Sequence, residues 1–116
     1  MPRCKINYKI NNDEFNALGI YKDNKLSFME NDIKFNIIIK DNYLELNREN
    51  NEYKINLIIG SNSSCTYELK DVMYKKMFMN VETKSLEISN NIIKAKYKLE
   101  DTLFNLYLTY EVIEWL

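Results

Sequence analysis

Apolar and polar residues alternate along most of the chain. In residues 93–99 the odd positions are apolar and the even positions are lysines, and residues 6–10, 33–39 and 53–59 also carry an apolar side chain at every second position. Successive side chains of a β-strand point to opposite faces, so this period of two predicts strands with one buried face and one wet face. The pattern predicts strands at residues 4–10, 14–21, 25–30, 33–40, 43–48, 53–59, 65–70, 76–88, 92–100 and 103–114.

Short polar breaks separate these runs, for example at residues 11–13, 22–24 and 89–91. They are rich in Asn and Asp, which tolerate positive φ angles and therefore serve hairpin turns in a chain with only two glycines. Connections this short force neighbouring strands to run antiparallel. One-sided strands cannot stay in one flat sheet without leaving apolar surface in water. We therefore expect an all-β fold, a single antiparallel up-and-down β-barrel of about 8–10 strands that forms one domain over residues 1–116.

Three segments are harder to assign. Residues 103–114 alternate but would also give a helical stripe, and their Tyr, Thr, Phe and Val content favours a strand. Residues 71–76 fit either one helical turn after Asp71 or a loop, and both alternatives stay open. From residue 77 to residue 88 the apolar positions change from odd to even numbers. One extra residue near Lys84 and Ser85 would restore the inward face, which predicts a β-bulge there.

Composition narrows the class of protein. The chain is 46% apolar and 28% charged with a net charge of −1, so we expect a globular protein rather than a disordered one. This charge gives no long-range field that would attract nucleic acid or anionic lipid. No apolar run approaches the roughly 18 residues of a membrane span, and the N-terminus lacks the apolar core of a secretory signal. We therefore expect a cytoplasmic protein without membrane association, in which Cys4 and Cys65 are free thiols.

Several short motifs, in this order, resemble the YwiB-like family of uncharacterised bacterial proteins. The matching stretches are residues 19–21, 26–28 together with Glu30, 44–48, 81–88 and 95–99, that is Gly-Ile-Tyr, Leu-Ser-Phe followed by Glu30, Leu-Glu-Leu-Asn-Arg, Val-Glu-Thr-Lys-Ser-Leu-Glu-Ile and Ala-Lys-Tyr-Lys-Leu. The turn that such proteins carry before the long strand departs from the family pattern here, because Asp71–Lys75 contains neither Pro nor Gly. The resemblance implies a calycin-like or lipocalin-like β-barrel, and it implies no activity, catalytic residue or ligand.

The residues of familiar catalytic sites are missing. The chain has no histidine, so Ser and Cys lack their usual general base. Gly19 and Gly60 are isolated and form no phosphate-binding loop. Two carboxylates can hydrolyse a glycosidic bond, but most of the acids considered fall on turns or on the outward phase. These acids are Glu30, Asp32, Asp41, Glu45 and Glu68. We therefore expect no enzyme, no metal site and no cofactor.

Two charged residues break the alternation. Glu30 is in phase with Leu26 and Phe28, and Arg48 is in phase with Leu44 and Leu46. If the phase holds to the strand ends, both side chains point inward near one rim, where a charge pair could hold a polar head group. The alternative is that the strand ends fray and both charges are solvated. A set of tyrosines shares the predicted inner face and would line an apolar cavity, although a barrel this small can also be filled by its own side chains. These tyrosines are Tyr8, Tyr21, Tyr53, Tyr97 and Tyr110.

Three functions follow from these observations. The leading hypothesis is a non-enzymatic binder of a small amphipathic molecule at the barrel mouth, with Glu30, Arg48, Tyr8, Tyr53, Tyr97 and Tyr110 as ligand-binding residues. The second is an interaction or homodimerisation module with a filled barrel that uses exposed Ile20, Ile38, Ile58 or Ile113. The third is a nucleic-acid-binding barrel that uses Lys94, Lys96 and Lys98 beside Tyr107 and Thr109. Surface lysines that prevent strand association explain the same ladder, so nucleic acid is the least favoured partner.

Overall fold

The computed structural model describes the backbone of residues 2–70 and 75–115. Within these residues the chain forms eleven β-strands. They are β1 (Pro2–Ile10), β2 (Asp13–Lys22), β3 (Lys25–Glu30), β4 (Ile33–Ile39), β5 (Tyr43–Glu49), β6 (Tyr53–Gly60), β7 (Ser64–Leu69), β8 (Lys75–Met79), β9 (Val81–Ser89), β10 (Ile92–Leu99) and β11 (Thr102–Trp115). In this part of the chain there is no helix of the length and apolar character that a membrane span requires.

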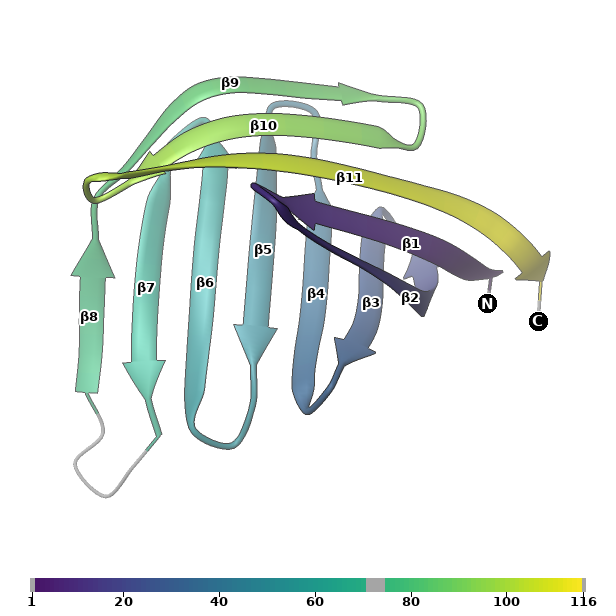
Figure 1. The fold of residues 1–116 in the computed structure, drawn as a ribbon, viewed down its shortest axis with the longest axis horizontal. Coiled ribbons are helices and arrows are strands. Elements are labelled where there is room, and N and C mark those ends of the chain that lie inside the picture. Colours follow the sequence, from purple (N-terminus) through teal and green to yellow (C-terminus); the bar gives the residue numbers. More distant parts are fainter. Residues whose placement is uncertain (1, 71–74, 116) are drawn as a thin grey trace.

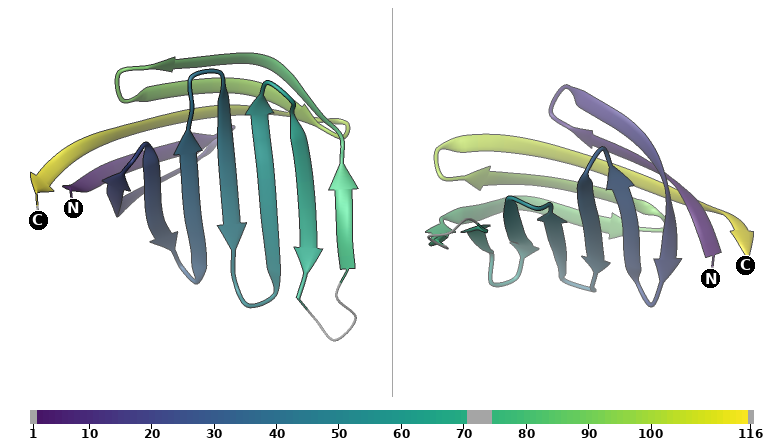
Figure 2. Two further views of the ribbon diagram at one scale, coloured as in Figure 1. Left: turned by 180° about the vertical axis from the view of Figure 1, so that it is seen from behind. Right: turned by 90° about the horizontal axis from the view of Figure 1, so that it is seen from below.

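All eleven strands belong to one antiparallel sheet. Its order is β8-β7-β6-β5-β4-β3-β2-β1-β11-β10-β9, so β1 pairs with β11 and every other pair joins strands that follow each other in sequence. In Figure 1, β9, β10 and β11 cross the direction of β4–β8 at a large angle. Figure 2 shows from below that these two groups form separate layers. The nearly closed, barrel-shaped sheet confirms the predicted all-β antiparallel barrel.

The number of strands differs from the prediction at one place. The expected single strand over residues 76–88 is wrong, because the chain breaks at Asn80 into β8 and β9. These two strands lie at opposite edges of the sheet order. Of the segment left open, residues 71–74 lie outside the described residues, and so does most of the turn that departs from the family pattern. Lys75 and Lys76 begin β8, and the ambiguous C-terminal segment is the strand β11.

Asparagine and aspartate shape the turns, as the polar breaks predict. Asn11 has a φ angle of 52° between β1 and β2, Asn31 has 55° between β3 and β4, and Asn91 has 61° between β9 and β10. Positive φ is strained for most residues, and Asn and Asp adopt it more readily because their side chains bond the local backbone. The short connections fix the register of each hairpin and therefore decide which side chains meet on the inner face.

Strand β2 makes the corner between the two layers. Residues Asp13–Ile20 pair with β1, and Gly19–Lys22 pair with β3. A Cβ atom at Gly19 would lie 2.5 Å from the carbonyl oxygen of Ser27 and 2.8 Å from Cδ1 of Ile6. No larger residue fits without moving β3, so glycine allows the close approach at this corner.

The core fills the space between the layers. It consists of inward side chains of the predicted phase, and none of the described polar or charged residues is fully buried in it. The core residues are Cys4, Ile6, Tyr8, Leu26, Phe28, Phe35, Ile37, Ile39, Leu44, Leu46, Leu57, Ile59, Cys65, Ile93, Ala95, Tyr97, Leu106 and Leu108. Burial of this one face is the main favourable contribution to folding, at roughly 25 cal/mol per Å² of apolar surface. Both cysteines are free and buried, as expected.

The predicted bulge is present in β9. Ser85 pairs with Lys96 and Thr83 pairs with Tyr97, so Lys84 is the extra residue. The bulge lets Val81 and Thr83 face inward before it, and Leu86 and Ile88 after it. A second bulge, which the alternation does not reveal, lies at Ile113, since Arg3 pairs with Glu114 and Cys4 with Val112.

A hydroxyl cluster joins the edge strand β9 to the end of β6 and the β6–β7 turn. The backbone N–H of Gly60 donates to Oγ1 of Thr83 at 2.9 Å, and the hydroxyl oxygens of Ser63 and Thr83 are 2.6 Å apart. Ser63 also donates to the carbonyl oxygen of Gly60 at 2.8 Å. Gly60 has a φ angle of 113°, a region that side chains with a Cβ avoid. These bonds link β9 to the end of β6 where no backbone ladder joins the sheet edges.

We predict that Thr83→Val lowers the free energy of unfolding by about 1–2 kcal/mol, because the Gly60 N–H loses its acceptor while the side-chain shape is kept. Thr83→Ser keeps the hydroxyl and should stay within about 0.5 kcal/mol of the wild type. Urea unfolding followed by far-UV circular dichroism measures both variants. Equal stability of the valine and serine variants would contradict a stabilising role for this hydroxyl.

Candidate functional site

Four aromatic rings pack together where the β1–β2 and β3–β4 hairpins meet. Tyr8 stacks on Phe15 with ring centroids 4.9 Å apart, and Phe28 stacks on Phe35 at 4.8 Å. Phe35 joins the two pairs, because its centroid lies 5.9 Å from Tyr8 and 5.8 Å from Phe15. We call these four residues the aromatic cluster. They are held in place because the hairpin registers set Tyr8 opposite Phe15 and Phe28 opposite Phe35.

Arg48 extends the aromatic cluster onto β5. It pairs with Phe35 of β4 on one side and with Ile55 of β6 on the other. Its guanidinium carbon lies 5.2 Å from the centroid of the Phe35 ring, within the range of a cation–π interaction. The Nε atom is buried and has no hydrogen-bond partner. A buried N–H without an acceptor costs about 1–3 kcal/mol, so this one donor of Arg48 is unsatisfied among the described residues.

The charge of Arg48 acts on two buried phenols. Burial raises the pKa of Tyr8 to about 12, and the nearby Arg48 charge lowers it in part. Burial also raises the pKa of Tyr97, and Arg48 again acts in the opposite direction. The two phenols come from β1 and β10, which are separated only by β11 in the sheet order, whereas Arg48 lies on β5. Arg48 therefore acts across the core on the layer that contains β1, β11 and β10.

The other predicted ligand-binding residues divide between two regions. Tyr97 stacks on Phe104 at 5.4 Å and is fully buried, and half-buried Tyr53 stacks on Tyr67 at 5.7 Å. Tyr110 instead stacks on Tyr21 at 5.3 Å, and its raised pKa follows burial first and then Tyr21. Tyr110 thus belongs to a separate ring pair, and the structure does not bring it to Arg48.

Glu30 does not pair with Arg48. It is half-buried at the end of β3, opposite Ile33. The ion pairs of the described side chains lie elsewhere and include Lys9–Glu14 at 3.9 Å, Lys76–Glu68 at 3.7 Å, Lys84–Glu82 at 2.9 Å and Lys70–Glu49. Among the described side chains, Glu30 and Arg48 therefore form no charge pair at the rim, and Arg48 has no carboxylate partner. In the same described part of the chain, no three His, Cys, Asp or Glu side chains gather closely enough to hold a metal ion.

The partners of Arg48 were missed from the sequence, although a signal for them exists. Phe28 and Phe35 share the inward phase of Arg48, and the short hairpin turns fix Phe35 between them. Tyr67 reaches Tyr53 through the β6–β7 pairing. Counting residues outward from each turn would have given these neighbours.

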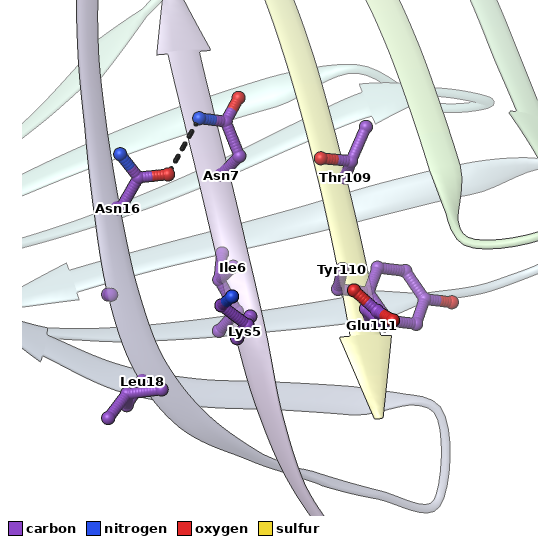
Figure 3. A pocket seen from close by; sticks show the side chains of 9 residues that line it. Lys5, Ile6, Asn7, Asn16, Leu18, Thr109, Tyr110 and Glu111 are labelled. Carbon is purple, nitrogen blue, oxygen red and sulfur yellow. Dashed lines mark hydrogen bonds between the residues drawn. The ribbon is translucent and has the colours of Figure 1, made fainter. Parts of the chain in front are cut away.

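Two hollows lie on the outer face of the sheet. The first, of about 670 Å³, crosses β1, β2 and β11, and Figure 3 shows Lys5, Leu18 and Glu111 along it, with Asn7 Nδ2 donating to Asn16 Oδ1 at 2.9 Å. The second, of about 550 Å³, lies over β9–β11 beside the lysine ladder. Tyr8, Arg48 and Tyr97 line neither of them. Tyr8 and Tyr97 are buried side chains of the core, whereas Arg48 is half-buried.

The lysine ladder and the exposed isoleucines lie on the outer face. The Lys94 ammonium is 5.7 Å from the Tyr107 ring centroid, and Glu87 of β9 lies opposite Lys94. The acidic neighbour weakens the local positive charge, and nucleic-acid binding stays a prediction. Ile20 and Ile113 are exposed as expected. The expectation that Ile38 and Ile58 are exposed is wrong, because both are half-buried by neighbouring side chains.

The fold defines a class: a single antiparallel sheet in the shape of a nearly closed β-barrel. Among solved structures, the crystal structure of ywiB protein from Bacillus subtilis is similar, with a TM-score of 0.62 and 18% sequence identity over 97% of this chain and 91% of that chain. No protein-family model and no curated protein sequence matches the chain. The match supports a β-barrel fold like that of ywiB, and at this identity it carries no function.

We predict that stability falls steeply between pH 10 and pH 12. In the unfolded chain Tyr8 ionises near its ordinary pKa of 10, whereas in the folded protein it stays protonated up to about 12. Its contribution is therefore fully present below pH 10 and is lost as the pH rises to 12, at roughly 1.4 kcal/mol per pH unit.

Tyr8→Phe should reduce this alkaline loss of stability, because the phenol that titrates only in the unfolded chain is gone. Tyr107→Phe, at an outward position of β11, should leave the loss unchanged. Urea unfolding at pH 9, 10.5 and 11.5 gives the free energy of unfolding of each variant and therefore its slope against pH. An identical slope in the Tyr8→Phe variant and the wild type would contradict the burial of this hydroxyl.

Proposed function

We propose that the protein is a non-enzymatic binding protein that holds a small amphipathic anion at the mouth of the barrel. Arg48 carries the proposal, because its Nε is buried without a hydrogen-bond partner. A carboxylate accepts two parallel hydrogen bonds from a guanidinium, and such charge-assisted bonds are strong where water is excluded. A bound carboxylate would supply the acceptor that the protein does not.

The surroundings of Arg48 suit the apolar part of such a ligand. Phe35 lies against the guanidinium, and Ile55 pairs with Arg48 on the next strand. Tyr53 and Tyr67 form a stacked pair on the neighbouring strands β6 and β7, and both are only half-buried. These rings and the isoleucine present an apolar surface beside one positive charge. The combination favours a ligand with a single anionic group on a short hydrocarbon or ring.

Glu30 sets a limit on the charge of the ligand. It lies at the end of β3, two residues beyond Phe28 of the aromatic cluster. Its carboxylate would repel a second anionic group near the rim and would accept a hydrogen bond from a hydroxyl or an amide. We therefore propose a monoanion, with Glu30 favouring a polar donor on the same ligand.

Decanoate is the probe that tests this function. Isothermal titration calorimetry should show one decanoate site per chain. Arg48→Met should lower the affinity for decanoate at least tenfold, which corresponds to about 1.4 kcal/mol of binding free energy. Decanol lacks the anionic group, so the wild type and the Arg48→Met variant should bind it equally. Arg48→Lys keeps the charge without the fork and should give an intermediate affinity.

Two controls separate binding from folding. Lys94→Met removes a lysine of the outer face and should leave decanoate binding unchanged. The free energy of unfolding of Arg48→Met should lie within about 1 kcal/mol of the wild-type value, because the substitution replaces a poorly satisfied charge with an unbranched apolar side chain. Unchanged decanoate affinity in the Arg48→Met variant, or no decanoate binding by the wild type, would contradict the proposed function.

A further inference from the structure

The sheet does not close on itself, and its two edges differ. Strand β9 forms one edge; it is bulged at Lys84 and bonded through Thr83 to Gly60 and Ser63. Bulges and side-chain contacts are the usual means by which a protein blocks an edge strand. Strand β8 forms the other edge. It pairs with β7 through all of its residues, and none of the other described strands lies on its second side.

Strand β8 also exposes large apolar side chains. Phe78 on its outer face is 76% exposed and Met77 on its inner face is 45% exposed. An edge strand with accessible apolar side chains and open backbone groups is a template for pairing with another strand. The strand is polarised as well, because Lys75 and Lys76 begin it while Phe78 and Met79 end it.

We propose that β8 pairs antiparallel with β8 of a second copy of this chain, about a two-fold axis at Met77. In this register Met77 lies opposite the partner copy's Met77. Lys76 lies opposite the partner copy's Phe78, and Lys75 lies opposite the partner copy's Met79. Residues directly opposite share a face of the sheet. The two strands are therefore complementary to each other, which a two-fold interface requires.

The polarity of β8 selects this arrangement. The Lys76 ammonium already lies 5.5 Å from the centroid of the Phe78 ring in its own chain, so the cation and the ring attract each other in this geometry. The antiparallel register repeats that contact across the interface twice. A parallel register would set lysine beside lysine, and the contact between lysine and the Phe78 ring across the interface would be lost. Lys76 is also 3.7 Å from Glu68 of β7, which offsets part of the positive charge that each chain brings.

The pairing would continue the sheet from one barrel into the next. On the inner face Arg48, Ile55, Tyr67 and Met77 are successive partners across β5–β8. Met77 ends this row at the open edge, and the partner copy's Met77 would extend it. The dimer would thus cover the exposed end of the row that carries Arg48. The interface does not require a ligand at Arg48, so the two proposals can fail separately.

A Met77→Cys variant tests the register. Opposite residues of an antiparallel pair have Cβ atoms about 4.5–5.5 Å apart, close enough for a disulfide after a small adjustment. Under mild oxidation Met77→Cys should form a covalent dimer, seen on non-reducing gels. Leu18→Cys is the matched control, since Leu18 is 58% exposed on the outer face of β2. Equal cross-linking of the two variants would overturn the register.

Sedimentation velocity of the unmodified protein tests the association itself. We expect a reversible dimer whose dissociation constant rises at least tenfold in Phe78→Lys, which sets lysine opposite lysine. Circular dichroism shows whether Phe78→Lys retains the fold, and Leu18→Lys is its control for added surface charge. A wild-type protein that stays monomeric at high micromolar concentration, or a Phe78→Lys variant that dimerises as well as Leu18→Lys, would overturn the proposal.

Discussion

The barrel depends on the burial of one face of a single continuous antiparallel sheet. No helix among the described residues covers that face, so the sheet must cover itself by bending. The sequence allows this bend through Gly19, where β2 approaches its neighbours closely, and through the Lys84 bulge on β9. Because side chains alternate between the faces, every hairpin register must agree with its neighbours, and a shift by one residue would turn apolar side chains into water.

The same constraint explains why the barrel stops short of closure. The break at Asn80 sends β9 across the other layer, so the sequence neighbours β8 and β9 do not form a hairpin. The Glu100 N–H donates to the Asn80 carbonyl oxygen at 2.8 Å and the Asn80 N–H donates to the Glu100 carboxylate at 3.1 Å, which ties this corner to the β10–β11 turn. Side-chain bonds at Thr83 replace the backbone ladder there. These bonds protect the β9 edge, so β8 is the less protected of the two edge strands.

Much of the fold could be predicted because it depends on local rules. Alternation identified the inner face, including Phe35, Tyr97 and Leu106, and the change of phase located the bulge at Lys84. The break at Asn80 could not be predicted, because both sides have the period and composition of a strand. The pairing of Tyr110 with Tyr21 depends on how β11 closes against β1, which is a contact between the two ends of the chain.

The position of Arg48 follows from the alternation, but its charge is not explained by folding. The alternation puts a guanidinium on the inner face, and the structure keeps it there, although folding gains little from a half-buried cation whose buried Nε has no acceptor among the described residues. Glu30, the carboxylate that the pattern offered as a partner, lies at the strand end and forms no ion pair with it. An apolar residue would suit the row between Phe35 and Ile55 better for stability alone. The unsatisfied Nε–H donor of Arg48 is therefore the one feature on which the proposed anion site rests.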